Sequence, residues 1–116
     1  MVAGTLQRPS RLFGSRLRSS TLIALRLLEE SYPSELARFL SSSVHSIQRI
    51  VESLESEGVL VGRPFGRTRR ISFNPRYVAH DELRALLWKL GEHDIDLQRA
   101  LARKRGRPRR AGKPGL

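Results

Sequence analysis

Apolar residues recur with helical spacing over most of the first 60 positions. Residues 22–28 are apolar except for Arg26, and Ser15 upstream is a candidate helix cap. This pattern predicts a helix over 15–30 that is buried on most of its sides, as in the middle of a small bundle. Pro33 suits the first turn of a helix and predicts a second, shorter helix that ends near Leu40.

A run of three serines, 41–43, interrupts the apolar pattern and predicts a turn. Ser43 is placed to cap a third helix that runs to Glu57, and Gly58 follows where a helix-terminating glycine is expected. The apolar stripe of this helix has the spacing of one buried face. It consists of Ile47, Ile50, Val51 and Leu54.

The helical pattern then gives way to two short runs with strand character, 59–61 and 69–73. The segment 62–68 between them is rich in turn residues, so the pattern predicts a β-hairpin. Ile71 and Phe73 are expected to face the core, and Phe65 is expected to be exposed at the tip.

Helical spacing returns after the hairpin and opens a last helical region near Asp81. We expect Gly91 to kink or end this helix before the apolar pattern resumes at Ile95.

This order of elements predicts a mostly α fold with a small β-hairpin, a winged helix-turn-helix. A tight turn between two helices lets the second one protrude into a major groove about 12 Å wide. The predicted domains are a flexible N-terminus over 1–10, the winged helix-turn-helix domain over 11–77, a C-terminal helical region over 78–102, and a basic disordered tail over 103–116.

Composition narrows the classes of function. The chain has 116 residues, no cysteine and a formal net charge of +11. This length excludes large catalytic folds, and the absence of cysteine excludes disulfides and thiolate metal sites. We expect no enzyme activity, no metal site and no cofactor. Without an apolar signal segment, a cytoplasmic, nucleoid-associated protein is expected, and its charge indicates nucleic acid rather than a membrane as partner.

The positive charge is concentrated at the C-terminus. Residues 103–116 hold seven of the 22 bases and none of the 11 acids. Part of this tail resembles an AT-hook, whose arginines enter the narrow minor groove of A·T-rich DNA. A tail that only binds phosphates is the alternative. The candidate DNA-binding residues are Lys104, Arg105, Gly106, Arg107, Pro108, Arg109 and Arg110.

Three segments carry a resemblance to a known family. Residues 13–18 (FGSRLR), 35–40 (ELARFL) and 46–60 (SIQRIVESLESEGVL) resemble ArsR-type winged-helix regulators, with a broader similarity to MarR-type domains. The resemblance covers roughly residues 11–77 and implies that the third helix reads DNA bases. In the family turn a glycine precedes an apolar residue, whereas Ser41 and Ser42 stand here.

The face of the third helix opposite its apolar stripe supplies the candidate base contacts. Gln48 can bond adenine bidentately and Arg49 can bond guanine. The alternative is an ordinary solvated helix face. The candidate residues are Ser43, Val44, His45, Ser46, Gln48 and Arg49.

Four arginines and no acid lie on the predicted hairpin. This composition suits contact with DNA phosphates, although a charged edge strand that limits aggregation is an alternative. The residues are Arg63, Arg67, Arg69 and Arg70.

A leucine stripe on the last helical region, together with the first helix, is the candidate homodimer interface. Dimerisation would place two recognition helices about 34 Å apart on DNA. The alternative is that the stripe packs onto its own domain. It consists of Leu83, Leu86, Leu87 and Leu90.

The function that these patterns favour is a sequence-specific transcriptional regulator that binds double-stranded DNA. Its effector, whether a small molecule or a protein, is not predicted. One alternative is a nucleoid-type architectural protein with little sequence preference. An RNA-binding protein is a weaker alternative, because aromatic residues, which stack on single-stranded bases, make up only 6% of the chain. A regulatory module that acts through protein contacts is a further class.

Overall fold

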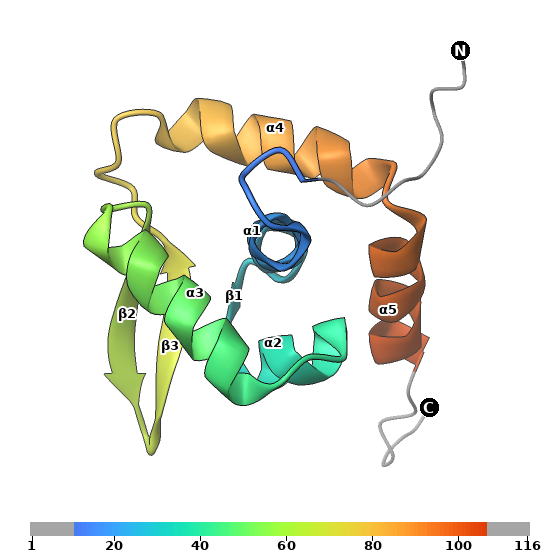
Figure 1. Cartoon of the computed structure of the whole chain (residues 1–116), viewed down its shortest axis with the longest axis horizontal. Coiled ribbons are helices and arrows are strands. Elements are labelled where there is room, and N and C mark those ends of the chain that lie inside the picture. Colours follow the sequence, from blue (N-terminus) through green and yellow to red (C-terminus); the bar gives the residue numbers. More distant parts are fainter. Residues whose placement is uncertain (1–10, 107–116) are drawn as a thin grey trace, which may run out of the picture.

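The computed structural model describes residues 11–106, in which four helices surround a central one. Helix α1 (Arg16–Leu28) is seen end-on in the middle of Figure 1, with α4 (His80–Glu92) on one side and α2 (Pro33–Leu40) on the other. Helix α5 (Ile95–Gly106) crosses beside α2. No helix in this described part of the chain is long and apolar enough to cross a membrane.

Helix α1 forms the middle of the core, as its apolar pattern predicts. The Ser15 hydroxyl caps it by accepting a hydrogen bond from the Arg18 amide at 3.0 Å. Ile23 and Leu25 are fully buried. The helix ends at Leu28 rather than near residue 30, because the next residues turn away and pair with a strand.

The sheet has three antiparallel strands, one more than the hairpin that the sequence predicts. Strand β1 (Glu30–Ser31) pairs with β3 (Thr68–Phe73), which also pairs with β2 (Leu60–Phe65). Ile71 and Phe73 of β3 face the core, as predicted.

The hairpin loop is much shorter than predicted. Pairing continues to Phe65 and Thr68, so only Gly66 and Arg67 form the loop, and Gly66 has φ 62°. A positive φ at the first loop position is typical of a type II′ turn, which glycine adopts without strain. Pro64 lies within β2, where an edge strand tolerates the missing backbone donor.

Helix α3 (Val44–Ser56) follows the short turn after α2, as predicted. Its stripe is buried at Ile47, Val51 and Leu54 and half-buried at Ile50. Gly58 has φ 80° and follows the C-terminal end of the helix, where glycine is favoured. Two helices, a tight turn and a hairpin therefore occur in the predicted winged helix-turn-helix order.

The break between the last two helices falls at 93–94, not at Gly91. Gly91 lies inside α4, where a β-carbon would approach Ile23 Cγ2 of α1 to 3.2 Å. Glycine thus serves close helix packing here rather than helix termination. The Asp94 carboxylate accepts a hydrogen bond from the Leu97 amide at 3.1 Å and caps the start of α5.

The leucine stripe of α4 packs mainly onto its own domain, the alternative that the sequence left open, while the dimer interface stays a prediction. Leu87 is fully buried, and Leu83 and Leu90 are partly buried against the core. Leu86 is the exposed member, at 41%. Helix α1 is buried over most of its surface, with Arg16 exposed at its start. Helices α4 and α5 therefore contribute to the same core as the elements before them.

Helix α5 extends into the segment that the sequence assigns to a disordered tail. Lys104, Arg105 and Gly106 are its last residues, so the first part of the AT-hook-like motif is helical rather than extended. Basic side chains in the last turn of a helix also interact favourably with its negative end. Arg107, Pro108, Arg109 and Arg110 lie outside the described residues, as does the predicted flexible segment 1–10.

The different environments of two adjacent leucines make the packing of α4 testable. Leu87→Ala is expected to lower the free energy of unfolding by about 2–5 kcal/mol, because it opens a cavity in the core. Leu86→Ala is the matched control and should cost less than about 1 kcal/mol, since its side chain is exposed. Urea denaturation at a protein concentration at which the chain does not self-associate measures both in the monomer, and equal effects would contradict this packing.

Candidate nucleic-acid interface

The first half of α3 presents an exposed face beside the helix-turn. Val44, His45, Gln48 and Arg49 are exposed, and Val44 is 39% accessible. Within residues 11–106, no hydrogen bond or ion pair holds the side chains of Gln48 and Arg49. Both are therefore available to a partner.

Two of the predicted DNA-contact residues, Ser43 and Ser46, form hydrogen bonds with each other at the start of α3. The Ser43 hydroxyl accepts a hydrogen bond from the Ser46 amide at 3.1 Å and donates one to the Ser46 hydroxyl at 2.9 Å. Ser43 is therefore the helix cap that the sequence predicts. Their first structural role is to fix the N-terminus of α3.

The turn before α3 places a serine in a conformation that glycine adopts more easily. Ser41 has φ 54° and ψ 49°, the left-handed region, and its amide donates to the Arg38 carbonyl oxygen at 3.3 Å. Ser41 stands where the resembled family has glycine. The β-carbon of Ser41 therefore strains a turn that a glycine would form freely.

Arg18 ties the second half of α3 to α1. Its guanidinium donates to the Ser53 hydroxyl at 3.0 Å and lies 3.5 Å from the Glu57 carboxylate. With its C-terminal half held in this way and its apolar stripe buried, α3 is fixed so that its N-terminal half points outward.

Two of the four hairpin arginines are paired with acids from other elements. Arg63 lies 3.5 Å from the Glu30 carboxylate of β1, and Arg69 is bonded to Glu55 of α3. The hairpin segment itself contains no acid, and Glu30 and Glu55 come from other parts of the chain, so the sequence pattern did not indicate these ion pairs. The paired charges are accordingly less available to DNA than their number implies.

Gly62 makes room for the pair between α3 and the hairpin. A β-carbon at this position would lie 2.6 Å from the Glu55 Oε2 atom and would collide with the Arg69 guanidinium. Nothing in the local turn pattern indicates this role, since the clash depends on an element across the domain.

The other two hairpin arginines differ from each other. The Arg70 guanidinium stacks 4.4 Å from the centroid of the Phe65 ring and 5.7 Å from that of Tyr32. Arg67 lies at the tip, exposed, and makes no hydrogen bond or ion pair within the described residues. Of the four hairpin arginines, Arg67 is the one whose charged group is exposed and makes no hydrogen bond, ion pair or ring contact with another side chain in the described residues.

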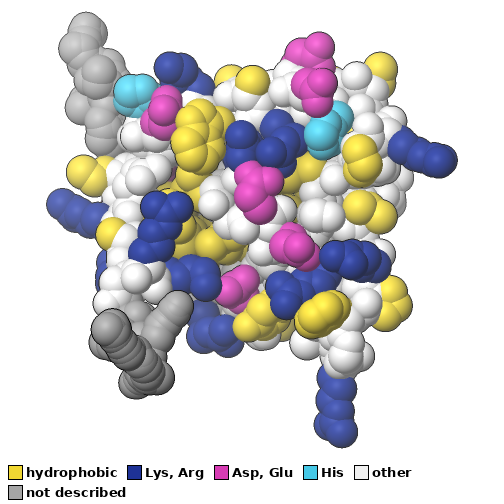
Figure 2. All heavy atoms as spheres, turned by 180° about the vertical axis from the view of Figure 1, so that it is seen from behind, with side chains coloured by type: hydrophobic (Ala, Val, Ile, Leu, Met, Phe, Trp, Pro, Cys, Tyr) yellow, Lys and Arg dark blue, Asp and Glu magenta, His cyan; other side chains and the backbone are white. Residues whose placement is uncertain are grey.

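Basic side chains of the α5 end lie next to α2. The Lys104 ammonium lies 3.1 Å from the Glu35 carboxylate, whereas Arg103 and Arg105 are exposed. Figure 2 shows that acidic side chains lie among the Lys and Arg side chains on the face opposite that of Figure 1. The described body is thus mixed in charge on that face.

No group of three or more His, Cys, Asp or Glu side chains suited to a metal ion occurs between residues 11 and 106. The His80 Nδ1 atom lies 2.8 Å from the neighbouring Asp81 carboxylate.

The chain resembles a known protein in its structure but not in its sequence. No family model and no curated protein matches the sequence. Among solved structures, the adhesin competence repressor (AdcR) of Streptococcus pyogenes superposes with a TM-score of 0.54 at 13% sequence identity. The match covers 75% of this chain and 65% of the repressor chain, so this chain spans less than two thirds of that neighbour. At this identity the match shows a shared fold, and the chain has the winged-helix fold.

The left-handed serine in the turn gives a prediction with an adjacent control. Ser41→Gly is expected to raise the free energy of unfolding by about 0.5–1 kcal/mol, because glycine removes most of a left-handed penalty of roughly 1–2 kcal/mol. Ser42→Gly should instead lower it, since Ser42 has no positive φ and glycine adds only unfolded-state entropy. Thermal and urea unfolding report both, and changes of the same sign would contradict the strain assignment.

Proposed function

We propose that this protein is a transcriptional regulator that binds double-stranded DNA in a sequence-specific way. The observation that carries the proposal is the exposed N-terminal half of α3, whose Gln48 and Arg49 side chains have no partner in the described structure. It lies on a winged-helix fold beside a basic hairpin. The resemblance to ArsR-type and MarR-type domains and the fold shared with a solved repressor support the same conclusion.

In this proposal α3 enters the major groove with its first turns. Arg49 bonds the O6 and N7 atoms of a guanine, and Gln48 bonds the N6 and N7 atoms of an adenine. Val44 is placed to contact a thymine methyl group. Ser43 and Ser46 hold the helix terminus, whose positive end faces a phosphate.

The hairpin acts as the wing and contacts the sugar–phosphate backbone or the minor groove. Arg67 at its tip is the primary contact, because the other three wing arginines are already paired or stacked. The bases at 103–110 add affinity that depends strongly on salt. A minor-groove hook requires an extended backbone, which α5 does not offer up to Gly106, so phosphate contact is the interpretation we favour for the tail.

A homodimer remains part of the proposal, with its contacts at the exposed stripe residue Leu86 and at other exposed apolar residues nearby. The exposed apolar residues of the last two helices include Leu86 at 41%, Trp88 at 43% and Ile95 at 44%. A dimer related by a two-fold axis would bind a pseudo-palindromic site.

Selection of bound duplexes from a random pool, at stated salt, tests the proposed function. Enrichment of one sequence supports a specific regulator, and a symmetric pair of half-sites supports the homodimer. Binding of all duplexes with similar affinity would instead favour the architectural alternative. Stronger binding to single-stranded RNA than to any duplex would overturn the proposal.

Two arginines are expected to affect binding in different ways. Arg49→Ala should weaken binding to the selected duplex by about 1–3 kcal/mol and relax preference at one base pair, because it removes a base contact. Arg67→Ala should weaken binding to all duplexes evenly and lower the salt slope by about 1. Fluorescence anisotropy over a salt series measures both; an even weakening in the Arg49 variant would refute base reading by this residue.

Removing residues 107–116 is expected to flatten the plot of log affinity against log salt while leaving the selected sequence unchanged. The deleted segment carries four bases and no acid, and each phosphate that they neutralise contributes about 0.9 to the slope. Anisotropy titrations of the full chain and the shortened chain provide the comparison. An unchanged slope would exclude the tail from DNA contact.

A further inference from the structure

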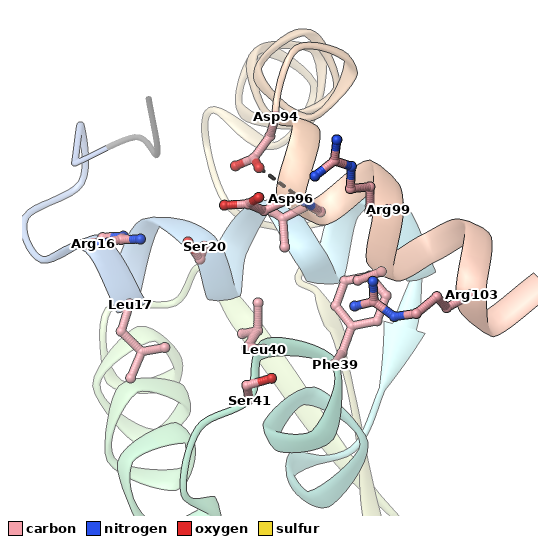
Figure 3. Close-up of a pocket in the computed structure, with 12 residues that line it drawn as sticks. Arg16, Leu17, Ser20, Phe39, Leu40, Ser41, Asp94, Asp96, Arg99 and Arg103 are labelled. Atoms are coloured by element: carbon pink, nitrogen blue, oxygen red, sulfur yellow. Dashed lines mark hydrogen bonds between the residues drawn. The ribbon is translucent and has the colours of Figure 1, made fainter. Parts of the chain in front are cut away.

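A basic groove runs along the seam between α2 and α5 and includes the start of the predicted basic tail. It consists of two adjoining hollows of about 550 and 680 Å³, and both are lined by Phe39, Ala100 and Arg103. Figure 3 shows the first hollow, with Arg16 of α1 on one side and Arg99 and Arg103 of α5 on the other. The shared lining makes the two hollows one continuous feature.

Basic side chains outnumber acidic ones around this groove. The bases are Arg16, Arg38, Arg99, Arg103 and Lys104, and the acids are Glu35, Asp94 and Asp96.

Two of these acids are already engaged by the protein. Glu35 pairs with Lys104 and accepts a hydrogen bond from the Ser31 hydroxyl. Asp94 is 8% exposed and caps α5 through the Leu97 amide. The charges that form no ion pair within residues 11–106 are four guanidinium groups and the carboxylates of Asp94 and Asp96, so the groove keeps an excess of positive charge and is suited to an anion.

The position of the groove favours a phosphate of the DNA backbone as the anion. Ser41 lines the first hollow and ends α2, and only two residues later Ser43 caps the recognition helix. In the proposed complex, a phosphate backbone that borders the major groove occupied by α3 would pass next to this seam. Gly106 lines the second hollow, and the chain continues from it into a segment with four more bases.

We propose that this groove binds phosphates of the DNA backbone next to the sequence that α3 reads. Arg38 of α2 and Arg103 of α5 are the principal contacts. Both are exposed, Arg103 has no partner within residues 11–106, and Arg38 makes only a 3.4 Å hydrogen bond to the Tyr32 hydroxyl. This inference rests on the proposed function and adds a second backbone contact on the side of α3 away from the wing.

The test is the salt dependence of duplex binding by the full chain carrying Arg38→Gln and Arg103→Gln together. The slope of log affinity against log salt is expected to fall by about 0.9 for each phosphate that the protein no longer neutralises, which is about 1.8 for two phosphates. Affinity should fall equally for the selected duplex and a random one, because phosphates carry no sequence information.

Two further variants separate a charge effect from a structural one. Arg38→Lys with Arg103→Lys keeps both charges and should retain the slope. Lys89→Gln removes a charge from α4, on the other side of α1, and should also leave the slope unchanged. Unfolding curves confirm that each variant is folded; neither Arg38 nor Arg103 forms an ion pair in the described structure.

The outcomes distinguish this inference from the function on which it rests. A slope that falls only in the Gln variant supports the groove as a phosphate site. A slope unchanged in the Gln variant overturns the groove while leaving the regulator proposal intact, provided that the unaltered protein binds a selected duplex. If the unaltered protein binds no duplex, both proposals fail together.

Discussion

The structure depends on the burial of α1 from every side. Ile23, Ala24 and Leu25 are completely inaccessible, and α4, α2 and the sheet each pack against part of the helix surface. Gly91 allows α4 to approach so closely that a single methyl group there would lie 3.1 Å from the nearest Leu27 atom. Because α1 cannot shift without disturbing all its neighbours, it is the frame from which the side-chain contacts of Arg18 fix α3.

Ion pairs between distant segments decide which charges a partner meets. Counting arginines on the hairpin suggests four equal contacts, whereas the fold engages three of them with Glu30, Glu55 and the Phe65 ring. The same principle applies at α5, where Lys104 is paired with Glu35, whereas Arg103 forms no ion pair within residues 11–106. Surface ion pairs are each worth only about 0–1 kcal/mol. Their main effect here is therefore to decide which arginine and lysine side chains stay available to a partner, rather than to stabilise the fold.

Local signals explain what the sequence predicts well. The Ser15 and Ser43 caps, the Pro33 start and the glycine after α3 act within a few residues, so the helix-turn-helix and its buried stripe follow from them. The features that the sequence misses depend on distant contacts. Strand β1 exists only because β3 pairs with it, and Gly91 resembles a helix breaker until α1 is placed against it. The candidate base contacts were predictable as an exposed face, but the acids that engage the hairpin arginines, and the groove beside α5, were not.

The stacking of Arg70 on Phe65 has a consequence for the entropy of association. Long side chains lose rotamer freedom when a partner fixes them, at about 0.5–1.5 kcal/mol each. On the hairpin this cost has largely been met during folding, because Arg63, Arg69 and Arg70 are already held by Glu30, Glu55 and the aromatic ring. Arg67 at the tip is left to be ordered and Arg63, 63% exposed, is held by one exposed ion pair, so the hairpin is preorganised in part of its surface.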